Sequence, residues 1–481
     1  MWCVMLGHVG EPPSSDGTTG LGTPNPTCRA AAYVVDVGRP NVLVVMSDQQ
    51  RPDSCGVYGQ RLPVTPALDG LAADGVVFDE AFTVQPVCGP SRAAFQTGRM
   101  PTAIGCWRNG LALPPGEPTL ASRLHDLGYQ TGYVGKWHLA SDRGPLLPDG
   151  RTAQRHETGA VPLERRGGYD AWAAADALEL TSGAYGGRMF DEDGREIRLE
   201  GYRVDAVTDV ALDRLARFDT TRPFLLFVSF LEPHHQNNRM RTIGPVGWAD
   251  RFRHFDVPGD LAGWRGDWRW NYAEYLACCA SIDANLGRLT DALRVQGRLD
   301  GTLVVYTSDH GSHFRTRNLE YKRSCHDASI RIPLVLSGPG FRGGRRRSAL
   351  RTNLDLVPTL VAAAGGIDPD LDGRPLQDDS GNDRDEVLIQ ISESHIGRAL
   401  RTRTHTIGVR ATTRNPLAGH LRPSADTYRL THLYDNDADP HQRTNLAGTT
   451  SNRALAEHLV DRLRRRIGRV EARTPQVVSP A

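Results

Sequence analysis

The sequence predicts an α/β sandwich with a central, mostly parallel sheet and a smaller C-terminal α+β subdomain. Continuous apolar runs, which are typical of strands covered on both faces, occur at 41–50, 129–140, 223–235, 301–311 and 331–340. Helical patterns alternate with these runs. In the helix expected over 273–296, apolar residues recur at spacings of three and four, at Leu276, Cys279, Ile282, Leu286, Leu289 and Leu293.

Composition narrows the function classes. The chain has 481 residues and a net charge of +1, so no overall field favours nucleic acid or an anionic membrane, and we expect neither as a partner. No apolar run reaches the roughly 18 residues of a membrane span. The start of the chain lacks the charged region and apolar core of a signal peptide. We therefore expect residues 1–39 to be a disordered leader and the protein to be cytoplasmic.

Eight cysteines are spread along the chain without a paired framework or the spacing of a zinc site, which favours a reduced protein. Residues 40–370 are predicted to form the catalytic domain and residues 371–481 the smaller subdomain. In the latter, Asp-rich turns (368–385) precede strand candidates near 387–391 and 405–411. A helix follows them, with an apolar face made by Leu455, Leu459, Leu463 and Ile467.

Two long polar segments, 141–172 and 236–271, are expected to form loops over the site. The second contains four tryptophans, which either make a stacking wall for a substrate or pack an irregular loop: Trp248, Trp264, Trp268 and Trp270. The arginine-rich stretch 342–348 is expected to be a solvated basic loop.

Polar residues gather where the predicted strands end. Parallel sheets bind ligands beyond the carboxyl ends of their strands, so this convergence predicts a single active site. The residues are Asp48, Gln49, Lys136, His138, His234, His235, Asp309 and His310.

Two of these strand ends predict a metal site. Asp48 with Gln49, and Asp309 with His310, together offer mainly oxygen ligands and one imidazole. Oxygen-rich sites suit Ca²⁺ or Mg²⁺, and the imidazole leaves Mn²⁺ or Zn²⁺ open. An aspartate after a strand is also often a helix cap, which is the alternative for each pair alone.

Cys88 lies in the stretch CGPSRAAFQTGR, where Pro90 suits the first turn of a helix beginning near Ser91. The backbone N–H groups of that turn, together with Arg92, favour a thiolate. From the residues alone, a buried cysteine at a helix start explains the pattern equally well.

Lysine is nearly absent. Of 57 basic residues only Lys136 and Lys322 are lysines, and the rest are arginines. Either these two positions need a compact point charge, or the two lysines have survived by chance.

The stretch CGPSRAAFQTGR resembles the signature of type I sulfatases, C-x-P-S-R followed by T-G-R. GKWH at 135–138 resembles the second signature, and SDHG and YKRS resemble later motifs of the family. The resemblance runs from about residue 40 to the C-terminus. It implies the alkaline-phosphatase-like fold, one divalent metal, with Ca²⁺ expected before Mg²⁺ or Mn²⁺, and conversion of Cys88 to formylglycine (3-oxoalanine) by a separate maturation enzyme.

The resemblance also implies roles for the site residues. Asp48, Gln49, Asp309, His310 and the oxidised Cys88 would hold the metal. The hydrated aldehyde would attack sulfur through one hydroxyl and release sulfate through the other. The residues expected to assist are Arg92 (orienting the diol), Lys136 and Lys322 (binding sulfate oxygens), His138 (handling the diol proton) and His234 (protonating the leaving oxygen, with His235 as the fallback).

The implied function is hydrolysis of sulfate monoesters of a carbohydrate or an aryl alcohol, by an enzyme that could form a homo-oligomer. Two departures from the pattern leave an alternative open. Gln49 replaces a second carboxylate, and His310 replaces an asparagine, a combination similar to that of phosphonate monoester hydrolases. A phosphonate or phosphodiester hydrolase is therefore the second hypothesis, and a non-catalytic binding protein with unconverted Cys88 is the third.

Overall fold

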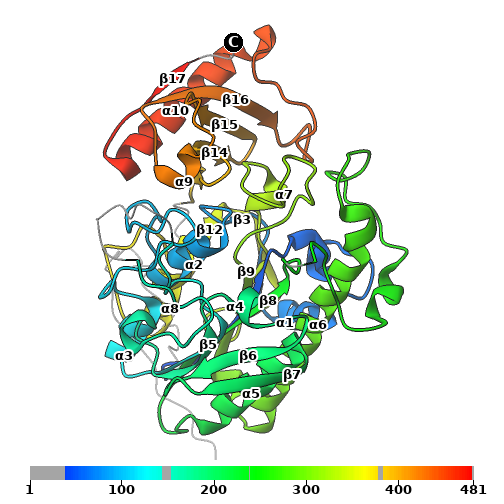
Figure 1. The fold of residues 1–481 in the computed structure, drawn as a ribbon, viewed down its shortest axis with the longest axis vertical. Helices are drawn as coiled ribbons and strands as arrows, with labels where there is room; N and C mark the ends of the chain where they lie inside the picture. The colour runs from blue at the N-terminus through cyan, green and yellow to red at the C-terminus, as the bar shows by residue number, and fades with distance from the viewer. Residues whose placement is uncertain (1–37, 144–152, 238, 378–382, 479–481) are drawn as a thin grey trace, which may run out of the picture. The chain divides into compact units, whose positions relative to one another are not determined.

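The computed structural model describes residues 38–143, 153–237, 239–377 and 383–478. The leader predicted at 1–39 lies almost wholly outside the described residues. Within them, a ten-stranded sheet forms the centre of the fold (Figure 1). Its order is β11 (Arg345–Arg347), β2 (Val76–Phe78), β10 (Leu334–Ser337), β9 (Thr302–Ser308), β1 (Asn41–Asp48), β8 (Phe224–Pro233), β4 (Gln130–Lys136), β5 (Ala171–Ala175), β6 (Tyr185–Asp191) and β7 (Glu196–Tyr202).

The middle of this sheet is parallel, as predicted. Strands β9, β1, β8, β4 and β5 pair in parallel, whereas β10, β6 and β7 pair antiparallel towards the edges. All of β1 after Asn41 is buried, and so is all of β8. Continuous Val, Leu and Phe runs suit such strands because both faces of a parallel sheet are covered.

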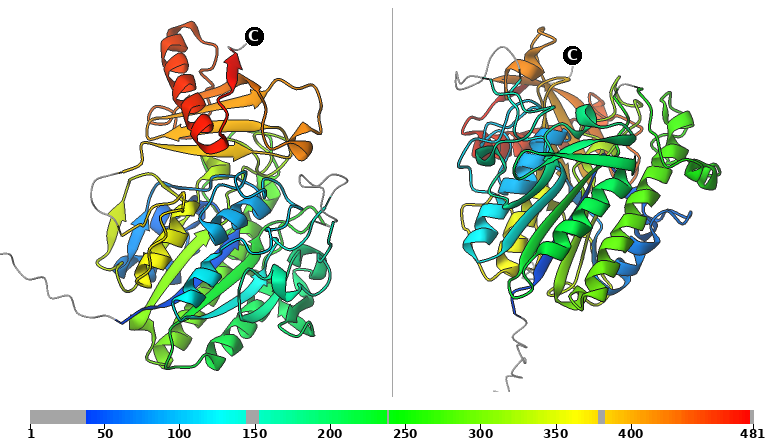
Figure 2. Two further views of the ribbon diagram at one scale, coloured as in Figure 1. Left: turned by 90° about the vertical axis from the view of Figure 1, so that its left-hand side faces the viewer. Right: turned by 60° about the horizontal axis from the view of Figure 1, so that its bottom comes forward.

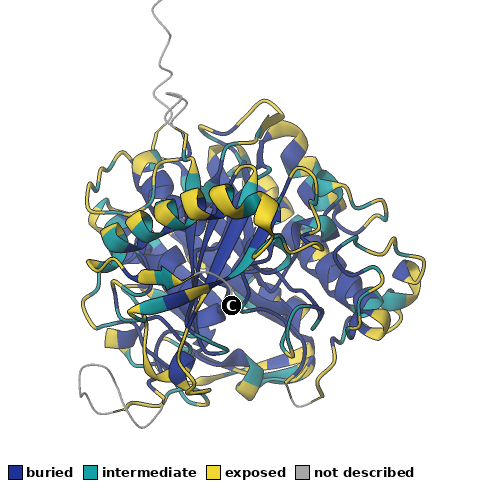
Figure 3. Cartoon of the chain, turned by 90° about the horizontal axis from the view of Figure 1, so that it is seen from above, coloured by how far each residue is buried: buried dark blue, intermediate teal, exposed yellow. Residues whose placement is uncertain are grey.

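Helices cover both faces (Figure 2). Val42 and Val44 of β1 belong to a hydrophobic cluster that includes α3 (Leu120–Asp126) and α8 (Leu356–Ala363). Leu43 and Val45 point the other way, into a cluster with α5 (Arg203–Arg217) and α6 (Trp268–Val295). Figure 3 shows the buried strands between helices whose outer faces are exposed. The remaining helices of this part are α1 (Pro66–Asp74), α2 (Cys88–Thr97), α4 (Leu178–Thr181) and α7 (Asp327–Ile330).

A second sheet of five strands follows towards the C-terminus. Its order is β13 (Glu386–Ile391), β14 (Gly397–Thr402), β15 (His405–Ala411), β16 (Thr427–Asp435) and β17 (Gln476–Val478), with α9 (Ala418–Leu421) between β15 and β16. The long helix α10 (Arg453–Glu471) packs on it through the apolar face that the sequence predicts. This smaller α+β layer is the one expected from the sequence, and β13 and β15 match the two predicted strands. The boundary at 370/371 stays a prediction.

Two expectations need correction. The stretch 342–348 is not only a loop, because Arg345–Arg347 form the edge strand β11, which pairs in parallel with β2. The short strands β3 (Ala81–Phe82) and β12 (Arg351–Thr352) pair in the same way. Helix α6 begins at Trp268, five residues before the predicted start at 273, because Trp268 and Tyr272 are buried in a cluster with Phe252.

The four tryptophans of 236–271 divide into packed and exposed ones. Trp268 is buried and Trp248 packs against the same cluster, so the packing explanation holds for both. Trp264 lies under the guanidinium of Arg317, 5.1 Å from its ring centroid. Trp270 is 62% exposed. Among the residues that the structure describes, no helix has both the length and the apolar character needed to cross a bilayer.

Candidate active site and metal centre

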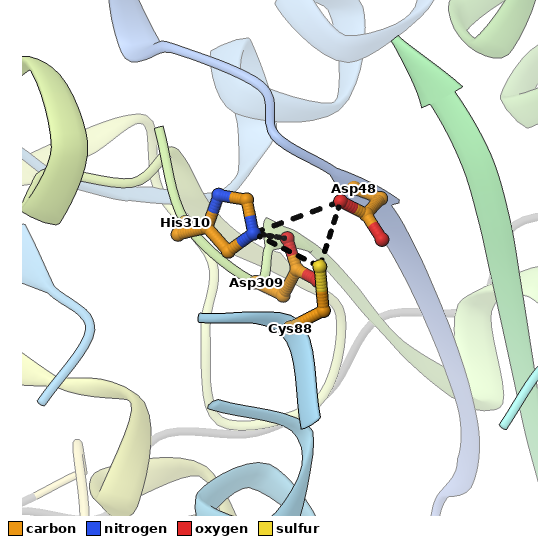
Figure 4. A group of neighbouring side chains, drawn as sticks. All are labelled: Asp48, Cys88, Asp309 and His310. Carbon is orange, nitrogen blue, oxygen red and sulfur yellow. Dashed lines mark hydrogen bonds and ion pairs between the residues drawn. The ribbon is translucent and has the colours of Figure 1, made fainter. Parts of the chain in front are cut away.

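The predicted strand ends converge on Cys88. Asp48 is the last residue of β1, Asp309 and His310 follow β9, and Cys88 is the first residue of α2. One ligand atom from each of the four side chains lies within 4.8 Å of the others, and all four residues are buried (Figure 4). The parallel pairing of β1 with β9 brings these residues together, although the two strands are more than 250 positions apart.

Helix α2 begins at Cys88, three residues before the predicted start near Ser91. Pro90 lies in its first turn, where its missing N–H is not needed for an intrahelical bond. Ser91 donates a hydrogen bond to the carbonyl of Asp309, with 2.5 Å between the oxygens, which joins the helix start to the end of β9. The predicted position of Cys88 beside a helix N-terminus is therefore correct, but its backbone is helical.

The cluster has the geometry of a metal site. The Cys88 sulfur lies 3.6 Å from Asp48 Oδ1 and 3.4 Å from His310 Nε2, and this nitrogen lies 3.5 Å from Asp309 Oδ1. His310 Nδ1 is 2.9 Å from the carbonyl oxygen of Gly311. A carbonyl only accepts hydrogen bonds, so Nδ1 carries the proton and Nε2 directs its lone pair at the cluster.

Gln49 stands at a sharp bend. Its φ of 76° is in the left-handed region, and its backbone N–H donates to Asp309 Oδ1 at 3.0 Å. Its side-chain Oε1 is buried without a hydrogen-bond partner. An unsatisfied buried oxygen is costly, and a divalent cation would satisfy it. The donor set of carboxylate and amide oxygens with one imidazole therefore fits a bound metal.

Two cationic side chains, Lys136 and Arg92, form ion pairs with the carboxylates of the cluster. Asp48 Oδ2 lies 2.8 Å from Lys136 Nζ and 3.1 Å from Arg92 Nη2. Arg92 Nε lies 3.3 Å from Asp309 Oδ2, so one guanidinium bridges both acids. Arg92 Nη1 also donates to Ser229 Oγ at 2.7 Å. Every one of these side chains is buried, which keeps the array in one geometry.

Lys322 adds a further positive charge to the cluster. Its Nζ lies 2.8 Å from the Cys88 sulfur and 2.9 Å from His310 Nε2. Its carbonyl accepts a hydrogen bond from Asn318 Nδ2 at 3.0 Å and lies 3.2 Å from the ring of His313. Both lysines of the chain thus lie at the same cluster, one on Asp48 and the other on Cys88.

These charges set the protonation states. Burial and the Asp48 carboxylate oppose ionisation of the Cys88 thiol, but the positive charges of Lys136 and Lys322 outweigh them and hold its pKa well below the usual value. Burial also raises the pKa of Asp48, and again Lys136 leads the positive charges that bring it well below the usual value. The cluster therefore favours the anionic form of both groups, as a metal centre requires.

Two of the predicted histidines line the same centre. His234, the residue after β8, places Nδ1 2.7 Å from the carbonyl oxygen of His235. The two rings stack at 4.3 Å, and His235 stacks on Tyr321 at 4.1 Å. Burial, followed by the charge of Lys322, lowers the pKa of His234 to about 4.

His138 follows β4 with a left-handed φ of 64° and is only partly buried. Its Nδ1 is buried without a hydrogen-bond partner. After Lys136, His138 contributes to the low pKa of Glu179.

Glu179 was not predicted from the sequence. It lies in the short helix α4, and its Oε2 is 3.3 Å from Lys136 Nζ. Burial would raise its pKa, but Lys136, His138 and His234 lower it to about 2, so it is ionised at neutral pH. No motif marks this glutamate, because only the fold brings α4 to the end of β4.

Comparison with known proteins agrees with this geometry. The family model described as Sulfatase matches residues 40–367. An ulvan-active sulfatase from Formosa agariphila is 29% identical over 452 residues, which cover 89% of this chain and 81% of that protein.

Two solved structures share the fold. A protein in complex with its substrate D-glucosamine-2-N,6-O-disulfate superposes with a TM-score of 0.74 at 22% identity, covering 91% of this chain and 99% of that one. The phosphonate monoester hydrolase of Agrobacterium radiobacter superposes with a TM-score of 0.62, also at 22% identity, covering 88% of this chain and 95% of that one.

Proposed function

Because this chain belongs to the sulfatase family and is a sulfuric ester hydrolase with the alkaline-phosphatase-like fold, we propose that it cleaves sulfate monoesters of a carbohydrate or an aryl alcohol at residue 88. The observation that carries the proposal is the buried cluster of Asp48, Cys88, Asp309 and His310, with both lysines of the chain on it. The relatives support the carbohydrate, since one acts on ulvan and a structural neighbour has a sulfated glucosamine as its substrate.

We propose that Asp48, Gln49, Asp309, His310 and residue 88 hold one divalent metal, Ca²⁺ before Mg²⁺ or Mn²⁺. Three of these side chains offer oxygens, and the buried, unpaired Oε1 of Gln49 supports its inclusion. Such an ion polarises a sulfuryl oxygen and activates the nucleophile beside it. Arg92 pairs with both Asp48 and Asp309 and fixes the two carboxylates in position.

Cys88 would be converted to formylglycine by a separate maturation enzyme. The hydrated aldehyde supplies one hydroxyl for attack on sulfur and a second that later expels the sulfate. The position supports this role, because the Cys88 side chain lies between the carboxylates and Lys322 at the start of α2. Arg92 would orient the hydrated group, and His138 would take or return its proton.

Lys136 and Lys322 would bind the sulfuryl oxygens. They approach the cluster from two sides, and their charges offset the negative charge that grows in the transition state. The anion-favouring field that lowers the pKa of Cys88 would act in the same way on a bound sulfate ester. Glu179 adds a fixed negative charge beside Lys136 and holds that ammonium in place.

His234 would protonate the leaving oxygen, with His235 as the fallback. The pKa of His234 is about 4 because of burial and Lys322. An anionic ester next to the ring raises the pKa of His234, so substrate binding itself would favour protonation of this histidine. The hydrogen bond from Nδ1–H to the carbonyl of His235 leaves Nε2 as the transferring atom.

The second candidate is a phosphonate monoester hydrolase. It is favoured by the neutral Gln49 and by His310, and by the fold shared with the Agrobacterium radiobacter enzyme. The test compares kcat/KM for an aryl sulfate, a saccharide sulfate and an aryl phosphonate monoester on one preparation with verified Cys88 conversion. A higher value for either sulfate supports the proposal. A higher value for the phosphonate reverses the ranking, and no turnover of converted, metal-loaded protein on any ester favours a binding protein.

A further inference from the structure

A separate pocket lies between the segment 317–326 and one face of the C-terminal sheet. Its volume is about 330 Å³, within the range of small-ligand sites. Three arginines and three histidines line it, and none of the lining residues is an aspartate or a glutamate. The charged and imidazole side chains of the lining are Arg317, Arg323, Arg410, His326, His395 and His432.

Two of the three arginines have no carboxylate partner in the part of the chain that the structure describes. Arg323 is paired with Glu320 and Glu393. Arg317 instead donates from both Nη atoms to backbone carbonyls, and its Nε is buried without a partner. Arg410, on β15, forms no ion pair among the described residues. Among the described residues, Arg410 is therefore the one arginine of the lining whose guanidinium has neither a carboxylate partner nor a hydrogen bond.

Arg410 has a further unfavourable neighbour. The β15–β16 register places it directly opposite Arg429, and like charges in cross-strand pairs are destabilising. Both side chains belong to the sheet face that borders the pocket. An anion near Arg410 would relieve this repulsion as well as the lack of counter-charge.

The histidines add neutral hydrogen-bonding groups. Burial, then Arg410, lowers the pKa of His395 to about 3, and burial, then Arg317, lowers that of His432 to about 4. Their Nδ1 atoms lie 3.0 Å from the hydroxyls of Ser394 and Thr431. The lining thus offers guanidinium, imidazole and hydroxyl groups together, the donor set that recognises sulfate or carboxylate.

The pocket wall is linked to the active site. Asn318 in the wall holds the carbonyl of Lys322, whose ammonium lies on Cys88. On the other side Arg323 pairs with Glu393, which accepts a hydrogen bond from the backbone of Asn109. The Asn109 side chain in turn accepts one from the N–H of Gly89, the residue after Cys88. Two short chains of contacts therefore join the pocket to the reacting centre.

We propose that this pocket binds a second oxyanion, a sulfate or carboxylate group, carried by the same saccharide whose sulfate ester is cleaved. The pocket has room for more than a single ion, and its wall continues into the loop of Lys322. The inference rests on the proposed function, which supplies the saccharide substrate. It adds the chemical class of that substrate, a polyanionic sugar whose second anionic group is bound away from the ester that is cleaved.

Binding to the Cys88→Ala variant tests this without turnover. Calorimetry would compare a saccharide monosulfate with regioisomeric disulfates of the same sugar, and with inorganic sulfate. We expect at least one disulfate to bind about tenfold more tightly than the monosulfate, the order of one charge-assisted hydrogen bond in a partly exposed site. Arg410→Gln should remove most of this preference. The matched control is Arg403→Gln, an exposed arginine beyond the other end of β15.

Each other outcome overturns the assignment. No preference for any disulfate, or a preference that survives Arg410→Gln, would exclude the pocket as the second anion site. Arg410-dependent binding of inorganic sulfate without a disulfate preference would make it a site for a free anion. Arg410 is exposed and its removal relieves the repulsion from Arg429, so a thermal midpoint no lower than that of the wild-type protein shows that the variant is folded. Hydrolysis of an aryl sulfate by the wild-type protein reports separately on the proposed function.

Discussion

The ammonium of Lys322 lies 2.8 Å from the sulfur of Cys88, although the two residues are 234 positions apart in the chain. The same nitrogen lies 2.9 Å from His310 Nε2, so Lys322 faces the nucleophile and a metal-ligand candidate together. The other lysine, Lys136, occupies the corresponding place on Asp48. An arginine-rich chain that keeps its two lysines at one centre uses them for a charge that a planar guanidinium does not reproduce.

Removal of the Lys322 charge should lower the rate of ester hydrolysis more than the stability of the folded protein. We expect Lys322→Ala to lower kcat for an aryl sulfate by about 10²–10³-fold, the order seen when one group that stabilises transition-state charge is deleted. Lys322→Arg keeps the charge in a different shape and should recover only part of the rate. Sulfate release at saturating substrate measures both. A near-normal rate for Lys322→Ala would remove Lys322 from sulfate binding.

The roles of His234 and His235 can be distinguished by how the activity of each variant depends on the leaving group of the substrate. A general acid matters most when the departing alcohol is a poor leaving group, so His234→Ala should lose about 10²–10⁴-fold on a saccharide sulfate and far less on an activated aryl sulfate. His235→Ala should show no such dependence on the leaving group. If the two variants have the opposite pattern, His235 is the proton donor.

Removal of the metal should lower both activity and stability. Chelation leaves the buried Oε1 of Gln49 without a hydrogen-bond partner among the described residues. A ligand present at 100 times its Kd stabilises the folded state by about 2.7 kcal/mol, so added Ca²⁺ should raise the thermal midpoint of chelated protein and restore turnover. Asp309→Asn should weaken this response. A midpoint that is insensitive to chelator and to Ca²⁺, Mg²⁺ and Mn²⁺ would contradict the metal assignment.

The partly buried histidines of the pocket that Arg317 and Arg410 line should make stability fall on acidification. The pKa of His395 is lowered to about 3, whereas an unfolded chain binds the proton near pH 6.5. The unfolded state therefore holds more protons between these values, and stability is lost as the pH falls below 6.5. At pH 5 this amounts to about 2 kcal/mol for His395.

Urea unfolding at pH 7 and pH 5 measures this loss. His395→Gln should reduce the difference between the two pH values by about 2 kcal/mol. The matched control, exposed His254→Gln, should leave it unchanged. Equal differences for wild-type and His395→Gln would show that His395 is not held neutral in the folded protein.

The sequence predicted the parts of the fold that local pattern controls. Continuous apolar runs marked β1, β4, β8, β9 and β10, because strands covered on both faces need them. Strands β14 and β16 escaped prediction, since β14 carries two arginines within six residues and β16 mixes polar and apolar residues on a half-exposed sheet. The edge strand β11 consists of arginines only, and pairing with β2 rather than propensity makes it a strand.

The site residues also divide into those that local sequence predicts and those that only the tertiary fold brings together. Asp48, Cys88, Asp309 and His310 were predicted from their places at strand and helix ends, and the structure brings them together. Glu179 was missed because nothing in its local sequence separates it from other surface acids. The pocket beside the loop of Lys322 was missed too, because Arg317 and Arg410 come to line one pocket only when the C-terminal sheet packs beside that loop.

The central claim is that residue 88, carried as a hydrated aldehyde beside a divalent metal, takes the sulfuryl group from the ester. The most direct measurement pairs the mass of the Cys88 peptide with sulfate release across preparations that differ in the extent of conversion. The account predicts a peptide that has exchanged its thiol for an aldehyde, and turnover proportional to the converted fraction. Equal turnover from preparations in which Cys88 is an unmodified thiol would contradict it.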